Sequence, residues 1–173
     1  MTKPATSLVD IAREVHDEAD MGSKPVYMYE RYMGFLEPLV RQPITLLELG
    51  IHKGESLKIF ASYFKNGKIV GVDIVDTKVD VSQYSNIAIE VCDQRDGARL
   101  AELSDKHAPE GFDIIIDDAS HFGAYSRLSF DALFPKLKSG GLYVVEDWGT
   151  GYWDDWPDGG RYERFHVQVH DGQ

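Results

Sequence analysis

Residues 44–56 of the chain read ITLLELGIHKGES, and this segment gives the clearest indication of the fold. Its first half is a continuous apolar run, which is typical of a strand buried on both faces of a sheet. Gly50 and Gly54 follow the run, and a helical spacing of apolar residues begins at Leu57. A buried strand, a glycine turn and a helix together indicate one unit of an open α/β sheet.

The same pattern continues along the chain. Four more short apolar runs lie at Lys68–Val72, Ile87–Val91, Phe112–Ile116 and Leu142–Val145. Helical stripes that stop at Asn66–Gly67 and before Pro135 separate some of these runs, while the spacing over residues 96–104 is a weaker helix signal. We therefore predict an α/β fold, a Rossmann-like open and mainly parallel sheet with helices on both faces.

Two amphipathic stripes precede the first strand. Apolar residues repeat at helical spacing from Leu8 to Val15 and from Tyr29 to Leu36, and the second helix is expected to begin near Pro25 and end before Pro38. We expect residues 1–43 to form a helical lead-in and residues 44–173 to form the Rossmann-like domain, in one compact unit.

Composition limits the partners. The 173 residues suit one domain, and 18 basic against 29 acidic side chains give a net charge of −11. This charge disfavours nucleic acid and anionic membranes as partners. The single cysteine, Cys92, is expected in the apolar core, and no apolar stretch approaches the length of a membrane span. Without an apolar signal segment at the start, we expect a cytoplasmic protein.

Acidic residues follow the first three predicted strands. In an open α/β sheet, ligands bind beyond the carboxyl ends of the strands, where Glu48, Asp73 and Asp93 are placed. Asp73 comes 25 residues after Glu48, the distance at which an acid that binds ribose hydroxyls is found. The dinucleotide pattern GxGxxG is absent, and a glycine turn can also serve the chain reversal alone. We nevertheless predict a nucleotide-type cofactor site.

The fourth and fifth predicted strands carry a stronger signal. One ends in Asp117, Asp118 and His121, and the other in Glu146 and Asp147. Carboxylates crowded at one rim repel each other unless a cation neutralises them, and Mg²⁺ prefers such oxygen ligands. We predict a magnesium site at Asp118, Glu146 and Asp147. For Asp117 a capping or supporting role is the alternative, and a lone histidine is commonly a packed or solvated residue.

Aromatic residues follow this rim. Trp148, Tyr152, Trp153 and Trp156 could form the wall of an acceptor pocket or pack back on the core, and both alternatives stay open.

Four motifs in this order and spacing resemble a known family: LLELGIHKGES, GVDI, DDASH and GGLYVVEDW. They resemble the class I S-adenosylmethionine-dependent methyltransferases, and most of all the metal-dependent sugar O-methyltransferases of macrolide and other natural-product pathways, with the related cephalosporin-hydroxylase-like group. The likeness covers about residues 20–150, including MYERYMGFLEPL before the first strand. The DDxSH and ED motifs are its specific part.

The resemblance implies a role for each matching residue. Glu48, Gly50 and Gly54 would border the methionine and ribose side of the cofactor, together with Ser56 and Asp117. Asp73 would hold the ribose hydroxyls, and Asp93 would lie near the adenine amino group. Asp118, Glu146 and Asp147 match the metal ligands, and His121 matches the general base. His52 stands where many members have a glycine, so the backbone approach to the cofactor is expected to differ there.

The resulting prediction is an enzyme: a cytoplasmic S-adenosylmethionine-dependent, Mg²⁺-dependent O-methyltransferase of natural-product biosynthesis. Its acceptor would be a hydroxyl of a small molecule such as a sugar. The alternatives are a non-catalytic methyltransferase-like binding protein or fragment, and an NAD-binding oxidoreductase.

The chain also looks short for this fold. Only 26 residues follow Asp147, and Phe165, Val167 and Val169 could form one short strand among them. We therefore expect C-terminal strands to be missing or shortened. The exposed edge of the fifth strand would then pair with another chain, which predicts a homo-oligomer.

Overall fold

The computed structural model describes residues 6–16 and 24–153. Five parallel strands form one sheet in the order β3-β2-β1-β4-β5. Their bounds are β1 Thr45–Leu49, β2 Lys68–Asp73, β3 Ile87–Val91, β4 Phe112–Asp117 and β5 Leu137–Val145. The sheet confirms the predicted Rossmann-like fold. Because the strand order reverses between β1 and β4, a ligand crevice is expected at the carboxyl ends of these two strands.

In the described part of the chain, five α-helices and three 3₁₀ turns accompany the sheet. The α-helices are α1 Leu8–Val15, α2 Val26–Leu36, α3 Glu55–Tyr63, α4 Gly97–His107 and α5 Gly123–Leu133. The 3₁₀ turns are η1 Glu37–Leu39, η2 Phe134–Lys136 and η3 Trp148–Tyr152. Within the described residues, no helix has the length and apolar character that would let it cross a membrane.

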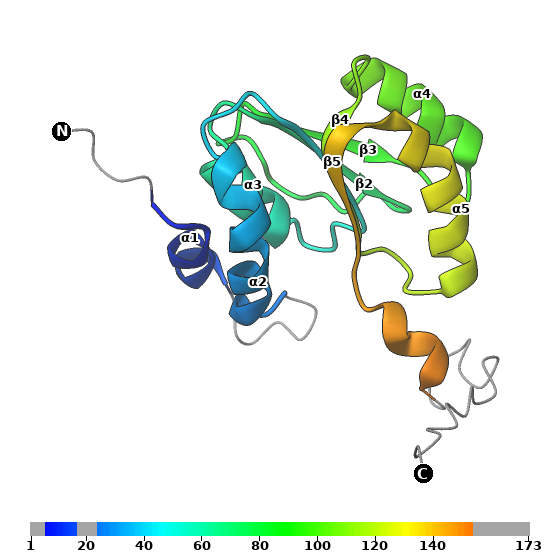
Figure 1. Cartoon of the computed structure of the whole chain (residues 1–173), viewed down its shortest axis with the longest axis horizontal. Coiled ribbons are helices and arrows are strands. Elements are labelled where there is room, and N and C mark those ends of the chain that lie inside the picture. The colour runs from blue at the N-terminus through cyan, green and yellow to red at the C-terminus, as the bar shows by residue number, and fades with distance from the viewer. Residues whose placement is uncertain (1–5, 17–23, 154–173) are drawn as a thin grey trace, which may run out of the picture.

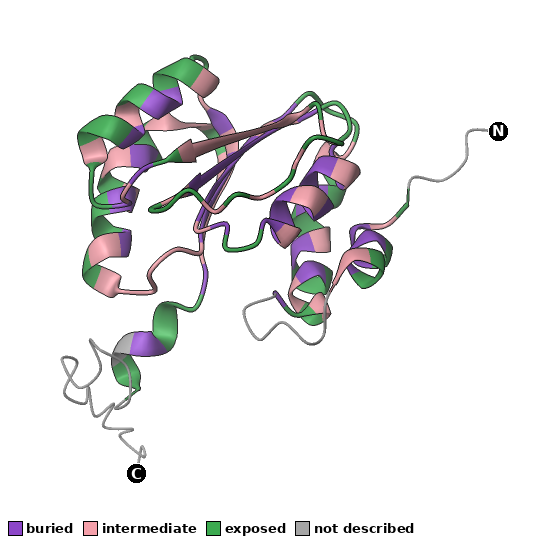
Figure 2. Cartoon of the chain, turned by 180° about the vertical axis from the view of Figure 1, so that it is seen from behind, coloured by how far each residue is buried: buried purple, intermediate pink, exposed green. Residues whose placement is uncertain are grey.

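Helices cover both faces of the sheet (Figure 1), with α1, α2 and α3 on one side and α4 and α5 on the other. Successive side chains of a strand point to opposite faces. Leu46 and Ile114 accordingly pack in the core under α1 to α3, while Leu47 and Ile115 pack in the core under α4 and α5. Figure 2 shows the buried central strands between these two layers. Burial on both faces is why these strands are continuously apolar in sequence.

The two N-terminal helices share a core with the sheet. The hydroxyl of Ser7 caps α1 by accepting a hydrogen bond from the backbone N–H of Asp10 at 3.1 Å. Tyr29 and Tyr32 of α2 pack edge-on against Phe60 of α3, with ring centroids 6.0 and 6.1 Å apart. This packing fixes α2 on the sheet, with Lys24 and Pro25 before its first turn at the carboxyl ends of the strands.

Two elements differ from the sequence expectation. The weak helix signal after Asp96 corresponds to α4, a full helix whose first turn is capped by the Asp96 carboxylate through the Arg99 N–H at 3.0 Å. β5 begins at Leu137, five residues before the expected apolar run, because the strand continues through Gly140 and Gly141 with a shift in register against β4. Gly140 has a φ of 79°, which an L residue rarely adopts.

β5 lies at the edge of the sheet formed by the described residues. The expected short strand over residues 165–169 falls outside the described part of the chain, as does Trp156.

Candidate functional site

The carboxyl ends of β1, β4 and β5 meet where the sequence places its acidic residues. The backbone N–H of Asp118 donates to the Leu49 carbonyl at 2.9 Å, and the N–H of Glu146 donates to the Asp117 carbonyl at 2.9 Å. These bonds continue the strand pairing past the strand ends. They hold the segments after the three strands in register, so that the side chains of this rim form one site.

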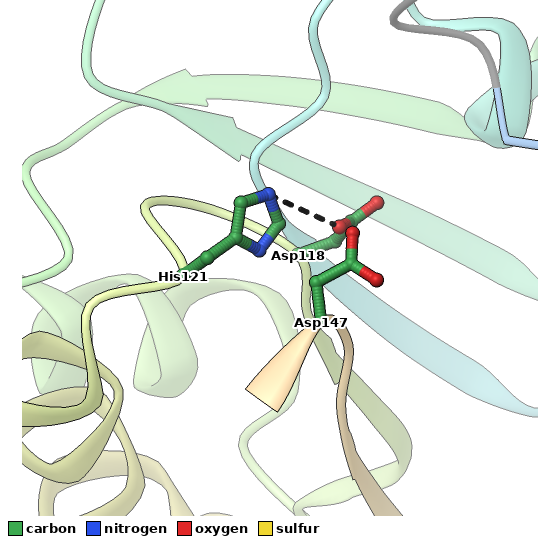
Figure 3. A group of neighbouring side chains, drawn as sticks. All are labelled: Asp118, His121 and Asp147. Atoms are coloured by element: carbon green, nitrogen blue, oxygen red, sulfur yellow. Dashed lines mark ion pairs between the residues drawn. The ribbon is translucent and has the colours of Figure 1, made fainter. Parts of the chain in front are cut away.

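Three side chains of this rim can hold one ion. Asp118, His121 and Asp147 each offer a ligand atom, and these atoms lie within 4.8 Å of one another. Figure 3 shows the three side chains pointing toward one another, with Asp118 and His121 from the loop after β4 and Asp147 from the end of β5. The Nε2 atom of His121 lies 3.9 Å from Oδ1 of Asp118. Two carboxylates and an imidazole are a donor set that a divalent cation accepts.

The backbone at this cluster adopts an unusual conformation. His121 and Asp147 have φ values of 59° and 49°, and His52 in the loop after β1 has 46°. Residues with a Cβ rarely occupy this left-handed region, and such residues gather at functional sites when the surrounding structure holds them. The left-handed backbone aims the His121 and Asp147 side chains into the cluster.

Glu146 takes a different position from Asp147. Its side chain is buried, and its Oε1 accepts hydrogen bonds from the ammonium group of Lys24 and the hydroxyl group of Tyr32. Burial raises the pKa of Glu146, and the nearby ammonium opposes that rise. Of the three expected metal ligands, Asp118 and Asp147 form a cluster with His121. Glu146 lies outside this cluster and pairs with Lys24.

Lys24 is the functional residue that sequence reasoning missed. Its Nζ lies 3.0 Å from Oδ2 of Asp118 and 3.8 Å from Oε1 of Glu48, in addition to its bond with Glu146. In sequence it belongs to a polar connector, where a lysine is ordinarily solvated, and neither periodicity nor motif indicated its burial.

Glu48 is fully buried at the end of β1. Its Oε2 accepts a hydrogen bond from the Ser56 hydroxyl at 2.7 Å, and burial raises its pKa to about 8. Ser56 lines the larger of the two cavities at this edge of the sheet, and Glu48 is not among the residues that line it.

Two cavities open at this edge of the sheet. The larger, of about 570 Å³, is lined by residues that include Gly50, Ser56, Asp73 and the Asp118–His121–Asp147 cluster. The smaller, of about 270 Å³, is lined by residues that include Asp93, Gln94, Arg95 and Tyr125. Gly50, Asp73 and Ala119 border both. The cavities are therefore neighbours along one crevice at the switch point of the sheet, where this fold binds its ligands.

Asp73 anchors the loop between β1 and α3. Its Oδ2 accepts the backbone N–H groups of Ile51 and His52 at 3.1 and 3.2 Å, and its Oδ1 accepts the N–H of Val75 at 3.2 Å. A carboxylate offers about four lone-pair positions. N–H groups of the described residues use three of these positions, and Asp73 also lines both cavities.

Of three other predicted cofactor residues, Asp93 lines a cavity, whereas Asp117 and Gly54 line neither. Asp93 lines the smaller cavity and pairs with the guanidinium of Arg95, which lies 5.0 Å above the Tyr125 ring. Asp117 is buried away from both cavities and accepts a hydrogen bond from Ser129 of α5 at 2.5 Å, so it links β4 to α5. Gly54 precedes α3 with a φ of 71° and lines neither cavity.

The aromatic residues after β5 lie at the surface. Trp148, Tyr152 and Trp153 are 57%, 65% and 56% exposed and line none of the described cavities. These three residues are therefore not part of the core, and their role at an acceptor pocket stays a prediction. Cys92 is buried, as expected, although it also borders the smaller cavity.

No family model matches the chain. Among curated proteins, it is 37% identical over 142 residues to L-olivosyl-oleandolide 3-O-methyltransferase of Streptomyces antibioticus, which covers 77% of this chain and 35% of the relative. It is 42% identical over 119 residues to mycinamicin VI 2''-O-methyltransferase of Micromonospora griseorubida, which covers 65% of this chain and 29% of the relative. The chain thus spans about a third of the length of these relatives.

The chain also resembles a solved methyltransferase structure. The MycE methyltransferase from the mycinamycin biosynthetic pathway, in complex with Mg, SAH and mycinamycin VI, superimposes with a TM-score of 0.75 and 31% sequence identity. The match covers 90% of this chain and 41% of that chain.

Proposed function

Since the chain belongs to the S-adenosylmethionine-dependent methyltransferases related to the macrolide and sugar O-methyltransferases, we propose that it methylates a hydroxyl group with the help of a divalent cation. The relatives are named for O-methylation of L-olivosyl-oleandolide and of mycinamicin VI. We accordingly propose a sugar or another natural product as the small-molecule acceptor.

The observation that carries the proposal is the cluster of Asp118, His121 and Asp147 in the wall of the larger cavity. Two carboxylates and one imidazole offer both the oxygen ligands of a hard cation and a base that can accept a proton near neutral pH. The residues present therefore fit a divalent cation such as Mg²⁺. Asp118 and Asp147 would hold it, with Glu146 as the third carboxylate of the rim.

The cofactor would lie along the crevice formed by the two cavities. Gly50, which borders both, lets the backbone approach the ligand, and Ser56 lies on the larger side, where the methionine portion would bind. Asp73, which lines both cavities, would accept a hydrogen bond from a ribose hydroxyl. The smaller cavity, with Asp93 and Tyr125 in its wall, would take the adenine ring.

Glu48, Gly54 and Asp117 would act from behind this crevice, since they line neither cavity. Glu48 holds Ser56 through its hydrogen bond, and Gly54 allows the turn into α3. Asp117 ties β4 to α5.

Methyl transfer needs a nucleophilic acceptor oxygen aligned with the methyl group. A divalent cation at the carboxylates supplies one part of this chemistry, because coordination lowers the pKa of a hydroxyl group. His121 would supply the base by accepting the hydroxyl proton at its imidazole, and S-adenosylmethionine, when bound, would supply the activated methyl group. The Oδ1 atom of Asp118 lies 3.9 Å from the Nε2 atom of this imidazole. The walls of the cavity would hold the acceptor oxygen in line with the methyl group.

A transfer assay tests this function. Methyl transfer from labelled S-adenosylmethionine to a panel of glycosylated natural products and phenols is expected, and EDTA should suppress it. His121→Ala should lower the rate by about 100-fold or more, the usual contribution of a general base. His107→Ala is the matched control, because this histidine contacts Glu90 outside both cavities.

Binding of S-adenosylhomocysteine, measured in parallel, separates the alternatives. Tight binding without transfer to any acceptor would favour a non-catalytic binding protein, and binding of NAD in its place would favour an oxidoreductase. Full activity of His121→Ala, or transfer that EDTA leaves unchanged, would contradict the proposed mechanism.

A further inference from the structure

Lys24 contacts carboxyl groups at the ends of three strands of the site. Its side chain is 5% exposed, and its ammonium group reaches Glu48 in β1, Asp118 after β4 and Glu146 after β5. These partners are far from it in sequence, 94 and 122 residues away for Asp118 and Glu146. Burying a lysine is costly unless its charge is paired, so this placement requires the carboxylates around it.

The contacts of Lys24 involve one oxygen atom each of Asp118 and Glu146. Lys24 contacts Oδ2 of Asp118, while Oδ1 of the same residue faces His121 at 3.9 Å in the candidate metal cluster. Lys24 and the Tyr32 hydroxyl both donate to Oε1 of Glu146. Lys24 and Tyr32 thus hold Oδ2 of Asp118 and Oε1 of Glu146, while Asp118 also belongs to the cluster with His121 and Asp147.

Charge favours the binding of a second cation beside the lysine. The one positive charge of Lys24 faces the carboxyl groups of Asp118 and Glu146, and Asp147 lies next to Asp118. The site therefore retains acidic groups that a divalent ion can neutralise.

We propose that Lys24 is a positioning residue for the metal site: with Tyr32, it fixes one oxygen each of Asp118 and Glu146, so that the remaining oxygens face the divalent cation. This inference rests on the proposed metal-dependent function and assigns a new residue to it. Groups that orient metal ligands commonly change metal affinity 10- to 100-fold when removed.

The alternative is that the ammonium merely substitutes for the metal. In that case the cation displaces Lys24 on binding, and removal of the lysine charge strengthens metal binding. The two ideas thus predict opposite signs for the same substitution, and Mn²⁺ binding followed by electron paramagnetic resonance measures that sign without relying on turnover.

Lys24→Met is expected to weaken Mn²⁺ binding at least 10-fold. Lys65→Met makes the same change at an exposed lysine with no ion pair in the described structure, and it should bind Mn²⁺ as the wild type does. Circular dichroism and S-adenosylhomocysteine affinity verify that each variant is folded. Unchanged or tighter Mn²⁺ binding by folded Lys24→Met would overturn the proposal.

Tyr32→Phe provides a second test that does not depend on the folding of Lys24→Met. It removes a donor to the same oxygen of Glu146 without changing charge. Mn²⁺ binding should weaken about 2- to 5-fold if the donors position that carboxylate, in line with the loss of one hydrogen bond of about 1 kcal/mol or less. Unchanged binding would again contradict the proposal.

The wild-type titration separates this inference from the proposed function. If wild-type protein binds no Mn²⁺, the metal-dependent function fails, and the role of Lys24 fails with it. If the wild type binds Mn²⁺ and both variants bind it equally well, only the role of Lys24 is wrong.

Discussion

Glu48 gives the site a pH dependence that can be measured at one residue. Its carboxyl has a pKa of about 8 in the folded protein, against 4.5 for an ordinary glutamate, because it is buried. The folded state therefore binds this proton more tightly than the unfolded state. The contribution of Glu48 to stability is complete below pH 4.5 and is lost as the pH rises toward 8, by at most about 1.4 kcal/mol per pH unit.

We expect Glu48→Gln to remove this dependence. The variant should resemble the wild type near pH 5 and gain unfolding free energy relative to it near pH 8, as measured by urea denaturation at both values. Glu110→Gln, at an exposed position, is the control and should show no such difference. A wild-type-minus-variant difference that stays constant with pH would contradict the assigned pKa.

Single residues of the site were predictable to different extents. Asp118, His121 and Asp147 were predictable, because parallel strands place the residues after their carboxyl ends on one edge. Lys24 was not, since its burial depends on contacts across most of the chain. Asp117 was expected at the cofactor, but its side chain, at the last position of β4, projects toward α5 and accepts a hydrogen bond from Ser129.

At the scale of elements, the loop between β1 and α3 depends on Gly50. This residue has a φ of 81°, and a Cβ placed on it would lie 2.2 Å from the backbone oxygen of Asp118. Gly50→Ala should therefore force the loops after β1 and β4 apart. We expect a loss of about 2 kcal/mol or more in unfolding free energy and weaker binding of S-adenosylhomocysteine, measured by urea denaturation and calorimetry.

Gly34→Ala is the matched control for this loop. Gly34 lies within α2, and a Cβ there would meet nothing within 4 Å. The substitution should stabilise the protein by roughly 0.5–1 kcal/mol, since alanine favours the helix. If both alanine variants had the same effect on stability and binding, the close approach of the loops after β1 and β4 would not explain why glycine is needed at position 50.

The strands were easier to predict than their connections. Continuous apolar runs identified all five strands, because burial on both faces leaves few polar positions. The early start of β5 was not visible, since Gly140 and Gly141 are typical of a turn. The weak apolar stripe of α4 buries only Leu100, Leu103 and Ser104, so much of this helix faces solvent and leaves little hydrophobic pattern in the sequence.

At the scale of the whole molecule, the outer edge of β5 is the place where another copy could associate. Beside this edge, α2 and β5 line a largely apolar groove of about 320 Å³ that includes Phe35, which is 65% exposed. Exposed strand edges pair readily with other chains. We predict that the 173-residue chain forms a homo-oligomer through this edge, detectable by sedimentation velocity over a range of concentrations.

Phe35→Glu should shift that equilibrium toward the monomer, because it places a charge in the groove. Leu128→Glu changes an exposed apolar residue of α5 instead and should leave association unchanged. A wild-type chain that sediments as a monomer at every concentration would show that the prediction is wrong.

The carboxylate of Asp73 has a consequence for the energetics of ligand capture. By holding the amides of Ile51 and His52, it orders the loop of the crevice during folding. An incoming ligand then finds this segment already in place and does not lose affinity to the entropy of ordering it. The same side chain proposed to recognise ribose would thus also keep its own binding loop rigid, so its removal would weaken the ligand complex by two separate routes.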